Sequence, residues 1–509
     1  MAAAAAAAAG PAEPPSGPAA GARFFCTAGR GLEPFLMREV RARLQATQVE
    51  YISGKVFFTT CSDLNMLKTL KSAERLFLLI KKQLPFNVSS VSKGKIFYEM
   101  QRFISDDPES WLNAISIWKN LLELDAKKTK LSQGDANPLK RKREENDSII
   151  AKKLKAEQMQ ETQENRERQL EEPKGEETLE RGDPLTEREE CQEELQNDVT
   201  KAGDILNQKD LTFRVSCRCS GAIAKTLSAQ EVGRIIGIAL MKHFGWKADL
   251  RNPNLEIFIH LNDTYSLMGI PVFRVSLASR AYLRTAGLRS TVAWAMASVA
   301  EIKTGAFVLD PMCGLGTILL EAAKEWPDVY YVGADVSDSQ LQGACDNVKA
   351  AGLMGKIELL KVSVIELPLP SESVDIIISD IPFGKKFKLG KDIKRILQEM
   401  ERVLHVGGTV VLLLSEDHRR RLTDCEGSGF PLNSKGSHSD EPGVEKCLIL
   451  EGETGISETV SSSFEASHQE CLHKMPPFGS LVPVECYKVS LGKTDAFIYK
   501  YKKSSSSGL

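Results

Sequence analysis

Short runs of Val, Ile and Leu recur along the C-terminal part of the chain, separated by stretches with helical spacing. Strands that are buried on both faces of a parallel sheet show this pattern, and the intervals are long enough for crossover helices. We therefore predict a doubly wound, Rossmann-like α/β domain that ends in a hairpin. The predicted strands are residues 306–310, 329–335, 357–361, 374–380 and 409–414, and the hairpin strands are residues 482–491 and 496–502.

Two upstream regions alternate strand-like and helical patterns on a smaller scale. Each predicts a small α+β layer. In the first region, residues 23–125, the strand-like runs are 24–27 and 55–59, and the first helical pattern is 32–44. In the second region, residues 206–277, the predicted strands are 211–216 and 255–260, and the predicted helix is 229–244.

Three segments lack these patterns. Residues 1–22 are rich in Ala, Gly and Pro, residues 126–205 in Glu, Lys, Arg and Gln, and residues 416–480 in Ser, Gly, Glu and His. Such compositions bury too little apolar surface to offset the entropy of the chain. We expect a disordered tail, a disordered charged linker and a disordered insertion, the last within an α/β domain that spans residues 278–502.

The composition excludes several functional classes. Hydrophobic residues make up 42% and charged residues 26% of the chain, as in globular proteins. The formal net charge of -2 excludes a strongly basic protein that coats nucleic acid, so any nucleic-acid contact requires a local basic face. We expect no membrane span, because no apolar run is long enough, and no metal site, because the eleven cysteines include no Cys-x-x-Cys pair.

The first candidate motif for chemistry is DPMCGLGT, residues 310–317, between a predicted strand and a helical pattern at 318–326. Its glycines would let a ligand approach the backbone, and the helix start offers free N–H groups. Asp335 ends the next strand, where an acid can accept hydrogen bonds from ribose hydroxyls. Together they predict an adenosine-containing cofactor. A structural turn at the glycines and a helix cap at Asp335 are the alternatives.

The kind of cofactor follows from a missing glycine. A dinucleotide fingerprint requires a third glycine for close helix packing, and Leu319 stands at that position. The spacing better fits S-adenosylmethionine, with Asp335 on the ribose.

The second motif is SDIPFG, residues 379–384, at the end of the fourth predicted strand, where open α/β sheets bind ligands. It resembles the [D/N]-P-P-[Y/F] motif of amino-group methyltransferases. The lone pair of an exocyclic base amine is delocalised into the ring, and acceptors for its two N–H groups would orient it towards the methyl group. Asp380 and the carbonyl of Ile381 are the predicted acceptors, Pro382 stiffens the turn, and Phe383 is predicted to stack on the base. An ordinary strand-ending turn is the alternative.

With these motifs in place, the chain resembles the THUMP-domain RNA methyltransferases. The similarity also rests on Phe213-Arg214-Val215, Asn252-Pro253, residues 246–250 and Leu288-Arg289-Ser290-Thr291. It covers about residues 23–125 and 206–502. The resemblance implies an N-terminal ferredoxin-like region (23–125), a THUMP region that binds structured RNA (206–277), and a methyltransferase domain that forms N2-methylguanosine in a small RNA such as tRNA or small nuclear RNA.

The resemblance also implies specific residues and a partner, a small zinc-binding activator subunit. Ser363 stands where relatives commonly have an acid that holds the adenine amino group, and Ile381 replaces the first proline of the motif. The predicted cofactor contacts are Asp310, Pro311, Cys313, Gly314, Gly316, Thr317, Asp335, Val336, Ser363, Val364 and Asp380. The predicted RNA contacts are Arg214, Lys225, Lys242, Lys247 and Arg251.

Two other functions stay open from the sequence: a non-catalytic RNA-binding protein with a decayed methyltransferase fold, and a protein amine or glutamine methyltransferase. The basic cluster at residues 140–143, with Lys152, Lys153 and Lys155, is typical of a nuclear import signal or of an ordinary solvated charge run. We expect a nuclear protein with a possible cytoplasmic pool.

Overall fold

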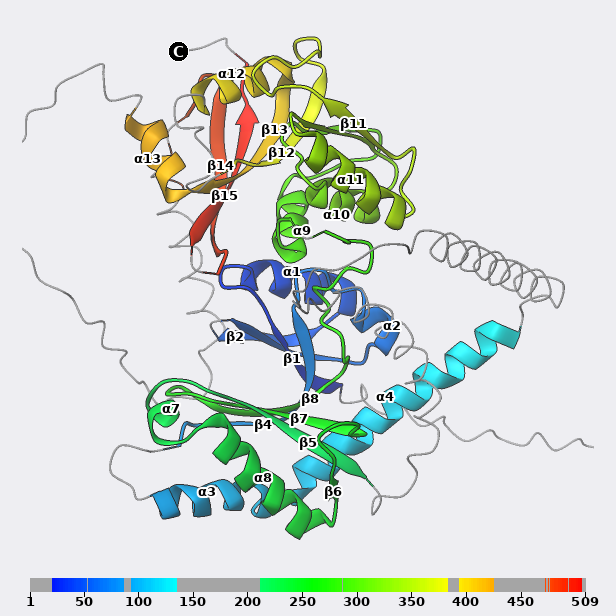
Figure 1. Cartoon of the computed structure of the whole chain (residues 1–509), viewed down its shortest axis with the longest axis vertical. Helices are drawn as coiled ribbons and strands as arrows, with labels where there is room; N and C mark the ends of the chain where they lie inside the picture. Colours follow the sequence, from blue (N-terminus) through cyan, green and yellow to red (C-terminus); the bar gives the residue numbers. More distant parts are fainter. Residues whose placement is uncertain are drawn as a thin grey trace, which may run out of the picture. The chain divides into compact units, whose positions relative to one another are not determined.

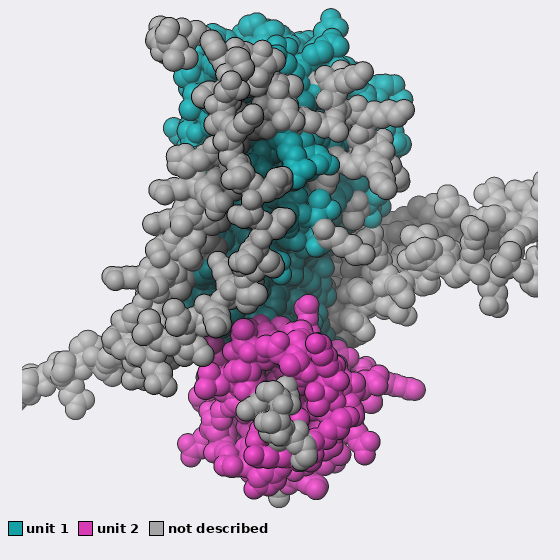
Figure 2. Space-filling model, turned by 90° about the vertical axis from the view of Figure 1, so that its left-hand side faces the viewer, with its two compact units in different colours: residues 1–62, 66–79, 271–509 teal, residues 63–65, 80–270 magenta. Residues whose placement is uncertain are grey.

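The computed structural model describes residues 21–52, 54–86, 93–134, 211–285, 287–382, 393–424, 472, 475, 477–492 and 494–505. The chain divides into two compact units (Figure 2). The first comprises residues 1–62, 66–79 and 271–509, and the second comprises residues 63–65 and 80–270. The basic cluster and most of the predicted tail, linker and insertion lie outside the described residues.

A seven-stranded sheet forms the core of the first unit, in the order β11-β10-β9-β12-β13-β15-β14 (Figure 1). The strands from β11 to β13 are parallel, and β15 and β14 continue the sheet antiparallel. This arrangement confirms the predicted doubly wound domain and its terminal hairpin. The strands are β9 (Phe307–Asp310), β10 (Tyr330–Asp335), β11 (Ile357–Lys361), β12 (Val374–Asp380), β13 (Leu404–Ser415), β14 (Leu481–Ser490) and β15 (Asp495–Lys503).

Helices accompany the parallel strands because their apolar residues recur at helical spacing. In α12 the buried positions are Ile393, Ile396, Leu397, Met400 and Val403, a single apolar stripe that packs in the same core as β12 and β13. The helices of this domain are α9 (Ser290–Val299), α10 (Thr317–Glu325), α11 (Asp338–Ala350), α12 (Ile393–Val403) and α13 (Glu416–Asp424).

The N-terminal part of the first unit is a small antiparallel layer with strand order β2-β3-β1-β4. Phenylalanines fill its core: Phe25 stacks on Phe77 with ring centroids 4.7 Å apart, and the tilted ring of Phe57 lies 5.6 Å from Phe25. The chain order β-α-β-β-α-β is ferredoxin-like, as predicted. Its elements are β1 (Ala22–Thr27), α1 (Glu33–Leu44), β2 (Thr47–Ile52), β3 (Lys55–Thr60), α2 (Leu64–Leu67) and β4 (Arg75–Gln83).

This N-terminal layer packs on the domain of the seven-stranded sheet within the first unit. Arg43 of α1 pairs with Glu325 of α10 at 2.6 Å and lies over the ring of Trp294. The N–H of Ser490 donates to the carbonyl of Arg30 at 2.9 Å. Residues that the sequence assigns to separate regions therefore share one compact unit.

The second unit holds four strands in the order β8-β7-β5-β6, with β5 and β7 parallel. Helix α8 packs on β5. It begins with a capping box formed by Ser228 and Glu231, and it ends at Gly245, which has a left-handed conformation. The elements are α3 (Lys93–Ser105), α4 (Pro108–Gly134), β5 (Thr212–Cys219), α7 (Ala222–Thr226), α8 (Ala229–Phe244), β6 (Lys247–Ala248), β7 (Leu255–Leu261) and β8 (Ser266–Pro271).

Some local expectations differ from the structure. The sequence pattern missed β2, which is an edge strand with no buried residue. Helix α4 continues to Gly134, past the predicted start of the linker, and α13 occupies the first nine residues of the predicted insertion. Leu422 explains the second difference, since it is buried in the core beside β13. Among the described residues, none of the helices combines the length and hydrophobicity that crossing a bilayer requires.

Candidate active site

Three carboxylates lie at one edge of the seven-stranded sheet. Asp310 ends β9, Asp335 ends β10 and Asp380 ends β12. The strands are parallel neighbours, with Gly333 opposite Asp310 and Ile377 opposite Leu309, so their carboxyl ends lie at the same edge. The structure therefore brings together the two motifs that lie 62 residues apart in the sequence, from 317 to 379.

The loop after β9, residues 311–316, depends on two glycines. Gly314 has φ of 52° and Gly316 has φ of 75°, both left-handed conformations that residues with a side chain rarely adopt. Gly316 is also the residue before α10, and its carbonyl accepts the first helical hydrogen bond, from Leu320 N–H at 2.9 Å. The loop thus presents bare backbone at the start of a helix, as a bound cofactor requires. We refer to it as the cofactor loop.

Asp335 holds the cofactor loop in place. Its Oδ2 accepts the N–H of Gly314 at 3.0 Å, and its Oδ1 accepts the N–H of Ser337 at 2.9 Å. Each carboxylate oxygen retains capacity for another hydrogen bond, so the ribose role predicted for Asp335 is compatible with both contacts. Ser337, and not Asp335, caps α11 by accepting the N–H of Gln340.

Asp310 is a buried acid with two donors. Its Oδ1 accepts the hydroxyl of Ser379 at 2.9 Å and the N–H of Met312 at 3.2 Å. Burial raises the pKa of Asp310 to about 7, partly offset by these two hydrogen bonds. Ser379 therefore links the acceptor motif to the first residue of the cofactor motif.

Asp380 differs from the other two acids in its hydrogen bonding. Its Oδ1 is covered from solvent and has no hydrogen-bond partner among the residues that the structure describes. Burial raises the pKa of Asp380 to about 7. Ile381 is fully buried, and its N–H donates to Leu413 at 3.2 Å, which fixes the backbone directly after Asp380. A buried acceptor without a donor fits a site for substrate N–H groups.

The remaining predicted site residues lie as follows. Pro382 is half-buried, and Phe383 lies outside the described residues. Cys313 is buried, and its burial raises the pKa of its thiol well above the ordinary value, which suits a pocket-lining residue and not a nucleophile. Ser363 and Val336 are exposed, whereas Val364 belongs to the hydrophobic core. The cofactor roles of these last three residues stay predictions.

Four of the five predicted RNA contacts are exposed in the second unit, namely Lys225, Lys242, Lys247 and Arg251. The fifth, Arg214, donates to Glu256 at 2.8 Å, and Ser216 donates to the other oxygen of the same carboxylate. Arg214 is therefore already paired within the sheet. RNA binding by these residues stays a prediction.

Comparisons with known proteins are consistent with this geometry. The THUMP domain model matches residues 193–270, and the "RMKL-like, methyltransferase domain" model matches residues 278–427. The chain is 79% identical over 498 residues to the U6 snRNA (guanine-N(2))-methyltransferase THUMPD2 of Homo sapiens, covering 98% of this chain and 99% of that protein. This chain belongs to the THUMPD2 family. The protein of Bos taurus with the same name is 76% identical over the same share of both chains.

Solved structures show the same fold outside the THUMPD2 family. TrmN from Thermus thermophilus is 18% identical, with a TM-score of 0.54 over 94% of this chain and 99% of that chain. SMU.472, solved as a complex with SAH, is 13% identical, with a TM-score of 0.52 over 96% and 99% of the two chains. These two likenesses show the fold. The family models and the THUMPD2 relatives show an enzyme with a THUMP domain ahead of a class I methyltransferase domain, whose cofactor is S-adenosylmethionine.

The residues present fit this cofactor of the THUMPD2 family. The methyl-bearing sulfonium is cationic, and Asp310, Asp335 and Asp380 supply negative charge at the sheet edge. The left-handed glycines leave the backbone accessible, and Asp335 would bind the ribose. Among the described residues, no group of acidic, Cys or His side chains could hold a metal ion.

Two residues of this site escaped the sequence interpretation. Ser379 was read only as part of a motif, although it holds Asp310. Asn347 was not singled out, although it is completely buried in α11 and donates to the carbonyl of Leu315 in the cofactor loop at 3.1 Å. An amide on the same helical face as the buried Ala344 and Val348 was the available signal.

Proposed function

We propose that this enzyme transfers the methyl group of S-adenosylmethionine to the exocyclic N2 of a guanosine in U6 small nuclear RNA. The observation that carries the proposal is the buried Oδ1 of Asp380, which has no partner among the described residues at the end of β12. A guanine amino group has two N–H donors and a lone pair delocalised into its ring. Acceptors at Asp380 and Ile381 would orient that lone pair towards the methyl carbon.

The transfer needs positioning more than strong base catalysis. The bond from N2 to the methyl carbon forms while the bond from sulfur to that carbon breaks, and the electron pair stays on sulfur. Orientation alone supplies effective molarities of about 10⁵ M or more. The proton lost from N2 can pass to the Asp380 carboxylate, whose pKa of about 7 makes it a better acceptor than an ordinary aspartate.

The choice of RNA rests on the relatives. The proteins at 68–79% identity are named for U6 snRNA, whereas those named for guanine 6 of tRNA are 26–27% identical to this chain. Substrate choice tends to be retained at the higher identity. The exposed Lys225, Lys242, Lys247 and Arg251 support a role for the THUMP unit in holding the RNA backbone.

The decisive experiment incubates the full chain with isotope-labelled S-adenosylmethionine and either a U6 snRNA or a tRNA transcript. Nuclease digestion and mass spectrometry then identify the methylated nucleoside. We expect N2-methylguanosine in U6 snRNA, with little in tRNA. Labelled protein without labelled RNA would support a protein methyltransferase instead, and bound but unmodified RNA a non-catalytic protein.

We also propose a small zinc-binding activator subunit as partner, an inference that rests on the resemblance to THUMP-domain RNA methyltransferases. Co-expression should yield a one-to-one complex with higher turnover than the chain alone. Equal turnover and separate elution of the two proteins would contradict this.

Finally, we propose that the protein acts in the nucleus. A nuclear RNA substrate and the basic cluster at 140–143 support this. Microscopy of the tagged chain should show nuclear signal, and replacing the four basic residues with alanine should move it to the cytoplasm. Unchanged localisation would exclude the cluster as the import signal.

A further inference from the structure

The segment between β8 and α9, residues 272–289, connects the THUMP domain to the methyltransferase fold in sequence, and we call it the connector. Its described residues belong to the first unit. Two sets of hydrogen bonds attach it to the helices that follow β9 and β10. Those are the same strands whose ends carry Asp310 and Asp335.

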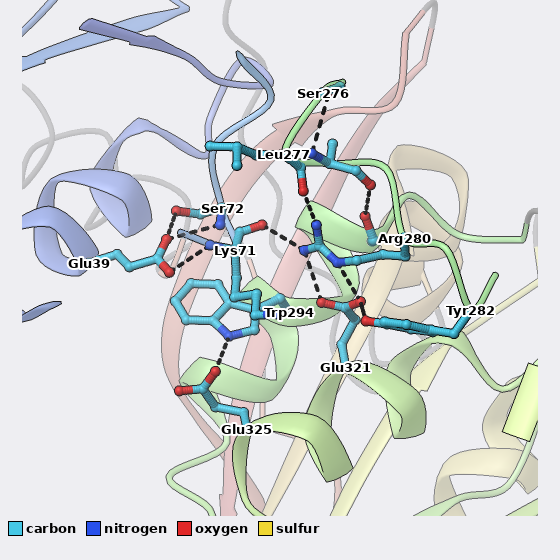
Figure 3. Close-up of polar contacts among 12 residues, drawn as sticks. Glu39, Lys71, Ser72, Ser276, Leu277, Arg280, Tyr282, Trp294, Glu321 and Glu325 are labelled. Carbon is cyan, nitrogen blue, oxygen red and sulfur yellow. Dashed lines mark hydrogen bonds and ion pairs between the residues drawn. The ribbon is translucent and has the colours of Figure 1, made fainter. Parts of the chain in front are cut away.

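The first attachment is to α10. Arg280 donates from Nε to Oε1 of Glu321 at 2.8 Å and from Nη2 to Oε2 at 3.0 Å (Figure 3). The side chains are only 5% and 1% exposed, and the hydroxyl of Tyr282 also donates to Glu321. Arg280 further donates to the carbonyl of Lys71 at 3.1 Å. A bidentate pair of this kind holds the connector at a defined position on α10.

The second attachment is Asn347 of α11, and it reaches the cofactor loop itself. Its Oδ1 accepts the N–H of Arg284 at 2.9 Å and that of Thr285 at 3.5 Å. Its Nδ2 donates to Leu315 at 3.1 Å and to the carbonyl of Thr285 at 3.5 Å. Leu315 lies between the two left-handed glycines. One buried amide therefore ties the connector to the segment of backbone that approaches the cofactor.

The connector also packs directly on the cofactor loop. A Cβ atom at Gly287 would lie 3.3 Å from Oγ1 of Thr317 and 3.5 Å from the Cβ of Leu315. The hydroxyl of Thr317 is buried and has no hydrogen-bond partner among the described residues. A side chain at position 287 would thus press on the start of α10, next to Gly316.

We propose that Asn347 is a positioning residue for S-adenosylmethionine: it fixes the carbonyl of Leu315 against the connector, so that the connector forms part of the cofactor site. Without the amide, the Leu315 carbonyl loses its donor and the cofactor loop gains alternative conformations. Ordering the loop then has a free-energy cost each time the cofactor binds. The effect falls on cofactor affinity, and the acceptor residues at the end of β12 keep their geometry.

The test is calorimetric titration of S-adenosylmethionine into the full chain and its variants. We expect the Kd to rise about tenfold in Asn347→Ala, as lost hydrogen bonds of this kind predict. Asn347→Asp keeps the shape and the acceptor towards Arg284 but removes the donor to Leu315. It should weaken binding to a similar extent, which separates the hydrogen bond from packing.

Steady-state kinetics provide the second measurement. In both variants KM for S-adenosylmethionine should rise with Kd, while kcat at saturating cofactor and KM for RNA stay within about twofold. A residue that only stabilised the fold would change the amount of active enzyme and leave KM for the cofactor unchanged. Gln342→Ala is the matched control, because Gln342 is an exposed amide on the same helix and donates a hydrogen bond to Asp346.

Gly287→Ala tests the same contact from the connector side if the Asn347 variants fold poorly. Its added methyl group should raise the Kd for S-adenosylmethionine about threefold or more. If both the Asn347 variants and Gly287→Ala bind within twofold of the unmodified chain, the proposal is wrong. Calorimetry needs no RNA, so the result is independent of whether U6 snRNA is the substrate.

Discussion

The cofactor loop and the end of β12 lie at the same edge of one sheet, yet their polar groups differ in whether they are hydrogen-bonded within the chain. In the cofactor loop, Asp335 accepts two backbone N–H groups and Leu315 accepts an amide N–H. At the end of β12, Asp380 keeps a buried oxygen without a partner among the described residues. The first arrangement is hydrogen-bonded within the chain, and the second leaves an acceptor for the N–H donors that we propose the substrate supplies.

This difference explains why the two motifs can work together. A cofactor that binds in every cycle gains affinity from a preformed loop, because little conformational entropy is lost on binding. An acceptor site gains selectivity from an unsatisfied buried oxygen, because a ligand without matching donors leaves it unpaired. The burial that leaves this oxygen unpaired also raises the pKa of Asp380.

Removing the unpaired acceptor should have the largest effect. Asp380→Ala should lower kcat by on the order of 10² to 10³-fold, because the amine loses its orienting partner. Turnover is measured with saturating RNA and cofactor. RNA binding, followed by filter retention, should be unchanged. Asp346→Ala, an exposed carboxylate of α11, is the control. Normal turnover in the Asp380 variant would remove it from the mechanism.

Removing the acid on the cofactor side should affect binding instead of turnover. Asp335→Ala loses the predicted ribose contacts and frees the N–H of Gly314, so Kd for S-adenosylmethionine should rise by roughly 10 to 100-fold. Calorimetry measures this, and kcat at saturating cofactor should fall far less than in the Asp380 variant. An unchanged Kd would contradict the ribose role.

The pH dependence of kcat/KM should report the titration of the buried acids. Because burial raises the pKa of Asp380 to about 7, the carboxylate form is lost as pH falls through neutrality. If the carboxylate is the active form, kcat/KM for RNA should fall about tenfold per pH unit below about 6.5 and level off above about 8. Asp310 titrates near the same pH, so cofactor affinity should be measured across the range as a control. A flat profile from pH 6 to 8 would count against a charged Asp380.

The smallest expected effect is a gain in affinity for S-adenosylmethionine when position 363 is changed. Ser363 is exposed after β11, and its hydroxyl accepts the N–H of Ile365 at 3.4 Å. Since the resemblance to THUMP-domain RNA methyltransferases implies an acid at this position, Ser363→Asp should tighten S-adenosylmethionine binding by about three- to tenfold through the adenine amino group. Ser363→Ala should have little effect. Equal affinity for all three forms would place the adenine elsewhere.

Much of the fold followed from local pattern. Residues 357–361, 374–380 and 229–244 were predicted as elements with the boundaries that the structure shows for β11, β12 and α8. The two strands are rich in Ile, Leu and Val, and α8 has a periodic buried stripe, so local propensity and burial agree. Element β2 was missed because none of its residues is buried and its place at the sheet edge is set by pairing with β3.

The residues of the candidate site also fall into those that could be predicted from sequence and those that could not. The glycines, Asp335 and Asp380 could be chosen from sequence, because each follows a recognisable strand and has a residue type that its chemistry requires. Ser379 and Asn347 could not, because a serine or an asparagine gains its role only from the partner that folding brings to it. Asn347 lies 32 positions from Leu315 and 63 from Arg284 along the chain.

The periodicity and identity of nearby residues were therefore sufficient to predict the doubly wound sheet, the two ligand motifs and the family. The folded chain was needed to show that Asp335 is hydrogen-bonded while Oδ1 of Asp380 lacks a partner among the described residues, and that the connector supports the cofactor loop. Hydrogen bonds between distant residues depend on ångström-scale geometry, and that geometry exists only once the whole sheet and its helices have packed.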